Sequence, residues 1–212
     1  HSVVHSGADF WKAAKKAFRK AAREIEKDIL NKGQTISTGY GRRNVLFAQT
    51  KKTEISCHAR GINYYFPNVR TILDMGGQDC KAINIDEEGN VTNFVMNDKC
   101  AGGTGRFLEM IADVLGVKLE DIGDMALASK NEIPFNTICA VFARSEAVTY
   151  LRTGAAKEDI LAGLNDAIAV RCLNLLKRVS IEKEFSISGG IAKNKGCLLY
   201  TSPSPRDRTR SR

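Results

Sequence analysis

Two apolar stretches of this chain end in a pair of glycines, and this repeated pattern constrains the fold more than any other feature. The first stretch, residues 71–73, reads as a buried strand that stops at Asp74, and EFSIS forms the second. Glycines let backbone N–H groups approach a phosphate or ribose, and open α/β sheets bind ligands beyond the carboxyl ends of their strands. One such turn alone would favour a structural role, but two favour a nucleotide cleft. The pairs are Gly76 with Gly77 and Gly189 with Gly190.

Polar side chains accompany both turns. Asp74 and Asp79 flank the first turn, and their hard oxygen atoms suit Mg²⁺, usually bound through water. Lys193 and Asn194 follow the second turn, which has no carboxylate. The chain contains no GxxxxGK[ST] pattern, so the turns do not form a P-loop.

A third glycine-rich segment, NDKCAGGTGRF, places Cys100 directly before a turn that leads into an apolar-periodic helix. A thiolate at such a position is stabilised by outward-pointing N–H groups and by the helix dipole. Cys139 has the same kind of setting, 39 positions further on, which is far from the CxxC clustering of a ferredoxin or zinc site. The residues alone leave core packing and cluster ligation equally open for both cysteines.

Strand and helix patterns alternate, which predicts an α/β fold with a central sheet covered by helices. An N-terminal capping box of Ser6 and Asp9 is expected to start an amphipathic helix with an apolar stripe from Phe10 to Ile29. A hairpin is expected over residues 80–97, turning at EEGN. Further helices are predicted over residues 46–59, 104–115, 120–130, 140–153 and 157–179.

Composition and charge exclude several classes of protein. The chain has 212 residues, no apolar run near the roughly 20 residues of a bilayer span, and no segment resembling a signal peptide. We therefore expect a cytoplasmic protein that binds no membrane. The net charge of +8 is concentrated at the two ends, so a nucleic-acid binder that uses the basic helix of residues 12–27 is a minor alternative.

Six cysteines in a chain of this kind argue against a disulfide scaffold, because the cytoplasm keeps thiols reduced. Cys80 and Cys172 lie in apolar patterns and are expected in the core. Cys57 and His58 are adjacent but lack the spacing of a zinc site, so a structural role is favoured for them.

Six motifs in order closely resemble the ATPase activators of 2-hydroxyacyl-CoA dehydratases and the ATPase subunits of benzoyl-CoA reductase. The resemblance extends from about Val3 to Gly196. It implies the actin-like, sugar-kinase-like (ribonuclease H-like) ATPase fold. The motifs are TGYGR, EISCHARG, DMGGQD, NDKCAGGTGRF, TICAVFARSE and SGGIAKNKG.

The resemblance also implies an activity. Members of the family are homodimers or paired subunits that share one 4Fe-4S cluster and use ATP hydrolysis to deliver a low-potential electron. It places the cluster ligands at Cys100 and Cys139 of each subunit, with a ferredoxin or flavodoxin as electron donor and an acyl-CoA dehydratase or benzoyl-CoA reductase as acceptor. Asp74 is the expected Mg²⁺-positioning residue, and Glu54, Gln78 and Asp79 are weaker candidates for orienting the attacking water. The expected nucleotide contacts are Gly76, Gly77, Asp79, Gly102, Gly103, Gly105, Gly189, Gly190, Lys193 and Asn194.

The chain departs from the family pattern at both ends. It starts after the GIDxGST-type phosphate loop and lacks an initiating Met, so residues 1–70 are expected to be an N-terminal subdomain without its first phosphate-binding strand. Residues 71–197 are expected to form the second subdomain, and residues 198–212 a disordered, non-native tail. We therefore expect a fold truncated at both ends that binds ATP poorly. A small-molecule kinase of the same fold, without a cluster, is the main alternative.

Overall fold

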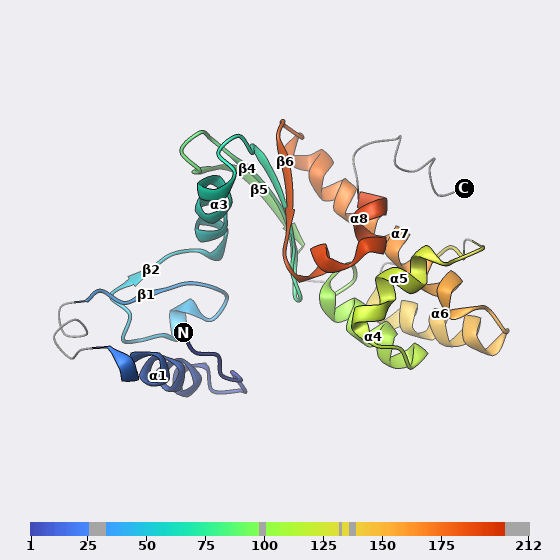
Figure 1. The fold of residues 1–212 in the computed structure, drawn as a ribbon, viewed down its shortest axis with the longest axis horizontal. Helices are drawn as coiled ribbons and strands as arrows, with labels where there is room; N and C mark the ends of the chain where they lie inside the picture. The colour runs from blue at the N-terminus through green and yellow to red at the C-terminus, as the bar shows by residue number, and fades with distance from the viewer. Residues whose placement is uncertain (26–32, 98–100, 132, 136–138, 202–212) are drawn as a thin grey trace. The chain divides into compact units, whose positions relative to one another are not determined.

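The computed structural model describes residues 1–25, 33–97, 101–131, 133–135 and 139–201. Figure 1 labels most of the helices and strands along the chain. The chain divides into two compact units, His1–Gly61 and Ile62–Arg212, and each is described here by itself.

Helix α1 (Phe10–Ala21) opens the first unit and continues as the 3₁₀ turn η1 (Ala22–Glu24). The predicted capping box is wrong, because the Oδ1 atom of Asp9 itself accepts a hydrogen bond from the Lys12 N–H at 3.0 Å. The helix is also shorter than predicted, since Ile25 has extended backbone angles. Ile29 lies outside the described residues.

The rest of the first unit contains two short parallel strands and most of a helix. Strand β1 (Ile36–Ser37) pairs with β2 (Thr50–Lys51), and the 3₁₀ turn η2 (Arg42–Asn44) lies between them in the chain. The helix predicted over 46–59 is displaced, because α3 spans Glu54–Tyr65. The hydroxyl of Thr53 accepts a hydrogen bond from the Ser56 N–H at 3.1 Å, which fixes the start of this helix.

The second unit contains a four-stranded mixed sheet in the order β5-β4-β3-β6. Its strands are β3 (Thr71–Met75), β4 (Cys80–Ile85), β5 (Val91–Asn97) and β6 (Phe185–Ser188). The predicted hairpin is confirmed as β4 and β5, which pair antiparallel. Strand β3 does not stop at Asp74 as predicted but continues through Met75, which pairs with Cys80. Figure 1 shows that β6, although far along the chain, lies beside β3.

Helices in the second unit follow the predicted order. Helices α4 (Gly105–Leu115), α5 (Ile122–Leu127), α6 (Ala140–Arg152) and α7 (Lys157–Val179) confirm the four predicted segments to within a few residues. The 3₁₀ turn η3 (Leu119–Asp121) precedes α5, and η4 (Gly190–Lys193) precedes α8 (Lys195–Thr201). Helix α8 therefore extends past the predicted boundary at Leu198, while residues 202–212 lie outside the described residues.

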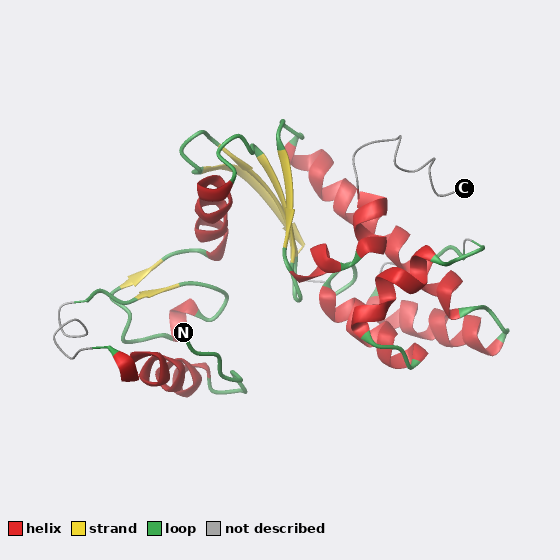
Figure 2. Cartoon of the chain, viewed as in Figure 1, coloured by secondary structure: helices red, strands yellow, loops and turns green. Residues whose placement is uncertain are grey.

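The core of the second unit packs the long helix α7 against the sheet and against α5 and α8. Both Cys80 and Cys172 are buried in it, as the sequence predicts, whereas Cys57 of the first unit is exposed. Figure 2 shows helices α4, α5 and α6 gathered beyond the end of the sheet where β3 and β6 finish. No helix in the described part of the chain has the length and apolar character that crossing a membrane requires.

Candidate functional site

The two glycine pairs lie at the same end of the sheet, because β3 and β6 are parallel neighbours and both end there. Asp74 of β3 is in register with Ser188 of β6, so Met75 lies beside Gly189 and the two glycine pairs follow at neighbouring strand ends. Gly189 has φ +92°, and a Cβ there would contact the carbonyl oxygen of Met75 and lie 2.9 Å from Asp74 Oδ1. Only glycine fits this close approach of the two strand ends without strain.

A lysine that the sequence analysis missed lies between the two acidic residues of the first turn. Lys81 is 4% exposed, and its ammonium contacts Asp79 Oδ1 and lies 3.7 Å from Asp74 Oδ2. Lys81 pairs directly with Asp74 across the antiparallel strands, so the register of the hairpin was the signal that could have identified it. The two carboxylates thus converge on one cation, which is the arrangement that a divalent ion would also require.

Two further residues were predicted to act in catalysis, Gln78 and Glu54. Gln78 is exposed at the tip of the first turn. Glu54 belongs to the first unit, where its Oε2 atom lies 2.6 Å from Nη1 of Arg42. Within the second unit, the structure brings Asp74 and Asp79 together at Lys81.

The start of helix α4 is fastened to the first turn by its backbone. The N–H of Gly105 donates to the Gly76 carbonyl at 3.0 Å, and the N–H of Arg106 donates to the Gly77 carbonyl at 2.9 Å. A Cβ on Gly105 would lie 3.0 Å from the Cα of Gly77, so the two segments are in close contact. The glycine-rich segment after Cys100 therefore adjoins the first turn directly.

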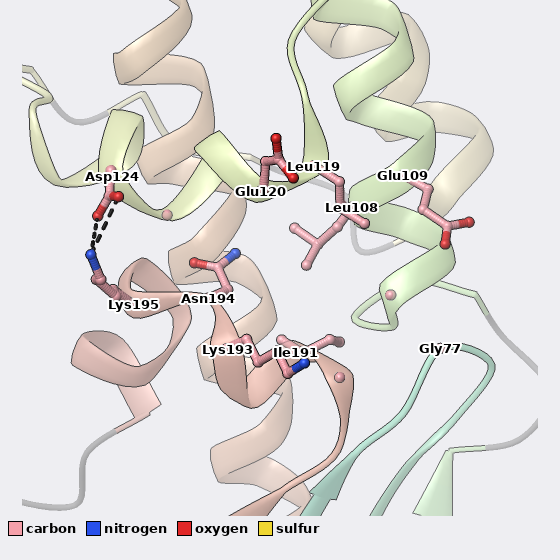
Figure 3. Close-up of a pocket in the computed structure, with 13 residues that line it drawn as sticks. Gly77, Leu108, Glu109, Leu119, Glu120, Asp124, Ile191, Lys193, Asn194 and Lys195 are labelled. Carbon is pink, nitrogen blue, oxygen red and sulfur yellow. Dashed lines mark hydrogen bonds and ion pairs between the residues drawn. The ribbon is translucent and has the colours of Figure 1, made fainter. Parts of the chain in front are cut away.

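A cavity of about 450 Å³ opens where both turns meet α4 and α5. In Figure 3, Leu108 and Leu119 lie on one side of it, and Ile191 and Lys193 lie on the other. Its lining residues are Gly77, Gly105, Leu108, Glu109, Leu119, Glu120, Gly123, Asp124, Gly190, Ile191, Lys193, Asn194 and Lys195. Five of these were predicted nucleotide contacts, namely Gly77, Gly105, Gly190, Lys193 and Asn194.

The contribution of helix α5 to this cavity was not predicted. Gly123 lies in the first turn of α5, and a Cβ there would lie 2.8 Å from Asn194 Oδ1 and 2.9 Å from the Lys195 backbone nitrogen. A glycine within a helical pattern was the available signal for such a close approach. Asp124 pairs with Lys195 at 2.9 Å on the rim, as Figure 3 shows. A cavity with apolar walls, glycine backbone and a polar rim suits a ligand that combines a flat ring with hydroxyl and phosphate groups.

Of the two predicted cluster cysteines, only Cys139 lies within the described residues. Cys139 is the N-cap of α6 and is exposed, and its carbonyl accepts a hydrogen bond from the Ala143 N–H at 2.9 Å. Val141 and Phe142 beside it are 72% and 64% exposed, so this helix start carries an apolar surface. Cys100 lies outside the described residues. Within the described ranges, no group of three or more His, Cys, Asp or Glu side chains is placed to hold a metal ion.

Comparison with known proteins confirms the predicted resemblance. Residues 4–202 match the BadF/BadG/BcrA/BcrD ATPase family. The 2-hydroxyisocaproyl-CoA dehydratase activator of Clostridioides difficile is 43% identical over 165 residues, which cover 78% of this chain and 62% of the activator. A benzoyl-CoA reductase subunit of Thauera aromatica is 31% identical over 197 residues, which cover 92% of this chain and 70% of that subunit. The chain spans about three fifths of the length of the dehydratase activator.

Solved structures confirm the predicted actin-like, sugar-kinase-like fold. The dehydratase activator of Clostridium difficile with bound ADPNP superposes with a TM-score of 0.79 at 37% identity, covering 98% of this chain and 74% of that one. MreB 5 of Spiroplasma citri has a TM-score of 0.50 at 14% identity, covering 90% of this chain and 67% of that one. At such low identity the second likeness shows the fold alone.

Proposed function

The chain belongs to the BadF/BadG/BcrA/BcrD ATPase family, and we propose that it acts in ATP-dependent electron transfer as the activator of an acyl-CoA dehydratase or benzoyl-CoA reductase. The observation that carries the proposal is the glycine-lined cavity in which both strand-end turns meet the start of α4. A related activator binds ADPNP, which is the class of ligand that this cavity suits.

ATP and Mg²⁺ fit the residues of this site. Gly77 and Gly190 line the cavity without side chains, so a phosphate group can approach their backbone closely. Asp74 and Asp79 converge on the Lys81 ammonium, and we propose that Mg²⁺ with its phosphates is held at these carboxylates. Lys81 then balances the charge of the two carboxylates and keeps them oriented. The bound Mg²⁺ would supply electrostatic stabilisation of the transferring phosphoryl group.

The proposed cluster is a 4Fe-4S group shared by two copies of the chain, or by this chain and a paralogous subunit, with Cys100 and Cys139 as the ligands from each. The exposed position of Cys139 at a helix start supports this assignment, because a partner must reach the sulfur. Exposed Val141 and Phe142 supply apolar surface for such a contact. A ferredoxin or flavodoxin would supply the electron.

We infer that the protein works in the cytoplasm of an anaerobic cell. The proposed cluster needs reduced thiols as its ligands, and the cytoplasm keeps thiols reduced. A low-potential cluster is also best preserved without oxygen.

Electron transfer is proposed to respond to the nucleotide through the first turn. Gly76 and Gly77 accept hydrogen bonds from the first residues of α4, so a ligand that moves this turn also moves the segment directly after Cys100. ATP can shift such an equilibrium only by binding one arrangement more tightly than the other, and its phosphates provide contacts that ADP lacks.

Anaerobic reconstitution with iron and sulfide tests the cluster. We expect absorbance near about 400 nm and about four iron atoms per dimer. Cys100→Ser and Cys139→Ser should each abolish both signals, whereas Cys57→Ser, at an exposed cysteine outside the proposal, should retain them. A chain that binds ATP but never acquires iron would support the kinase alternative instead.

Calorimetric titration with ADPNP and Mg²⁺ tests the nucleotide site. Gly123→Ala should weaken binding by about tenfold, because the new methyl group must displace Asn194 or Lys195. Gly61→Ala is the matched control, since Gly61 is also a helical glycine and a Cβ added there would have no atom within 4 Å. Equal affinity for both variants and the wild type would place the nucleotide outside this cavity.

A further inference from the structure

Arg171 of helix α7 lies against the glycine-rich segment that precedes α4. Gly103 has φ +81°, and a Cβ placed there would lie 2.7 Å from Cδ of Arg171. The arginine side chain therefore packs against Gly103 on the side where any other residue would carry its Cβ atom. Among the residues that the structure describes, no carboxylate lies within ion-pair distance of the Arg171 guanidinium.

The guanidinium is instead hydrogen-bonded to the side-chain amide of Asn97. Nη2 of Arg171 donates to Oδ1 of Asn97 at 2.8 Å, and Nδ2 of Asn97 donates to the Gly102 carbonyl at 3.2 Å. An amide has one accepting end and one donating end, and arginine can only donate. Arg171 therefore fixes the orientation of the Asn97 amide so that its N–H₂ group faces Gly102.

The neighbouring strand holds the next carbonyl of the same segment. Cys80 is the cross-strand partner of Asn97, and its thiol donates to the Gly103 carbonyl at 3.0 Å. Two consecutive carbonyl groups are thus held by the paired ends of β4 and β5. Gly105 and Arg106, a few residues further along, are hydrogen-bonded to the first glycine turn.

We propose that Arg171 is a positioning residue that, through Asn97, fixes the backbone conformation of Gly102 and Gly103, so that movement of the Gly76–Gly77 turn is transmitted to the segment directly after Cys100. This inference rests on the proposed function, and it assigns the coupling to particular side chains. A segment with three glycines can otherwise absorb a displacement by rotating its own backbone. Because hydrogen bonds hold this segment both at Gly102 and Gly103 and at the start of α4, we expect its residues to move together.

Hydrogen–deuterium exchange of the full chain, with and without ADPNP and Mg²⁺, separates nucleotide binding from this transmission. In the wild type, we expect the nucleotide to slow exchange in residues 76–79 and in residues 101–104. In Arg171→Met, the protection of 76–79 should remain. The added protection of 101–104 should fall by roughly fivefold to tenfold, which is the effect of one hydrogen bond on an opening equilibrium.

Three further variants sharpen the experiment. Arg171→Lys keeps a donor and should restore most of the lost protection. Asn97→Asp still accepts from Arg171 but cannot donate to the Gly102 carbonyl, so it should behave like Arg171→Met. Arg178→Met removes an exposed arginine from the last turn of the same helix and should match the wild type.

Each result has a defined meaning. Unchanged nucleotide-dependent protection of 101–104 in both Arg171→Met and Asn97→Asp overturns the inference. So does exchange that is faster by the same factor with and without nucleotide, because that pattern indicates a merely structural role. A wild type that shows no protection at 76–79 or 190–195 contradicts the proposed nucleotide site itself.

Discussion

The two glycine turns at the carboxyl ends of β3 and β6 look alike in sequence, but different side chains surround them. In each pair the first glycine is sterically required and the second is not. A Cβ on Gly76 would lie 2.8 Å from the Asp79 carbonyl oxygen, and one on Gly189 would contact the Met75 carbonyl oxygen. A Cβ on Gly77 or Gly190 would have no atom within 4 Å.

The difference lies in the side chains around each turn. The first turn is charged, with two carboxylates on the buried Lys81 ammonium. The second turn is followed directly by the short helices η4 and α8, and its backbone passes close to β3. In the proposed function, the first turn would bind the phosphates and the metal, and the second turn, which has no carboxylate, would bind the ring and sugar.

Gly189→Ala should have the largest effect on stability. The substitution combines a left-handed backbone with a collision against a neighbouring strand, and we expect it to lower the free energy of unfolding by about 4 kcal/mol. Urea denaturation measures this loss. Gly190→Ala, at the next position, should stay close to the wild type, and an equal loss in both variants would mean that backbone flexibility rather than the close approach matters.

Lys81→Met should come next and should affect the first turn alone. Removing one partner from a buried ionic group leaves charges uncompensated, so we expect a loss of about 3 kcal/mol in the free energy of unfolding. The exposed Lys177→Met is the matched control. If added Mg²⁺ restores part of the lost stability in Lys81→Met but not in the wild type, the cation is replacing the ammonium. No effect of Mg²⁺ on the variant would argue against a metal at these carboxylates.

Asp74→Asn should have a smaller effect, confined to the metal. The neutral amide is a weaker ligand, so the dependence of ADPNP affinity on Mg²⁺ should weaken by about tenfold, while affinity measured without Mg²⁺ should change little. Titrations at a series of Mg²⁺ concentrations check this expectation. An equal loss with and without the ion would assign Asp74 to direct contact with the nucleotide.

The fold was largely predictable because its signals are local and periodic. The helical patterns of α4 to α7 and the alternating hairpin of β4 and β5 specify both the type and the approximate limits of each element. The larger errors in the limits of helices lie in the first unit, where few side chains are buried and capping decides where a helix begins. Asp9 and Thr53 each begin a helix that apolar periodicity alone places wrongly.

The candidate site was predictable where backbone conformation demands glycine and unpredictable where tertiary contacts decide. The glycine pairs were recognised from their sequence, but Lys81 belongs to the site only through the strand register. Arg171 joins it from a helix 74 positions away from Asn97 in the chain. A single sequence carries no local sign of such a contact.

One buried cysteine follows each glycine turn, and the reactivity of its thiol shows how readily the structure around that turn opens. Cys197 follows the second turn within α8, and burial raises the pKa of its thiol to about 12. Cys80 follows the first turn, and the pKa of its thiol is raised by a hydrogen bond with Cys172 and by burial. Both thiols therefore stay protonated in the folded chain at pH values where a thiol in water, with a pKa of about 8.5, already ionises.

Alkylation of the folded chain with iodoacetamide at about pH 8 should accordingly modify Cys57 and Cys139, which are exposed, and spare Cys80 and Cys197. Peptide mass spectrometry identifies the modified positions, and denaturation in urea should expose the spared thiols. Because the folded chain holds the Cys197 proton more tightly than the unfolded chain, the contribution of this thiol to stability is complete below about pH 8.5 and is lost as the pH rises towards 12. Rapid alkylation of Cys197 but not of Cys80 would mean that the second turn and α8 open readily, whereas the charged first turn stays closed.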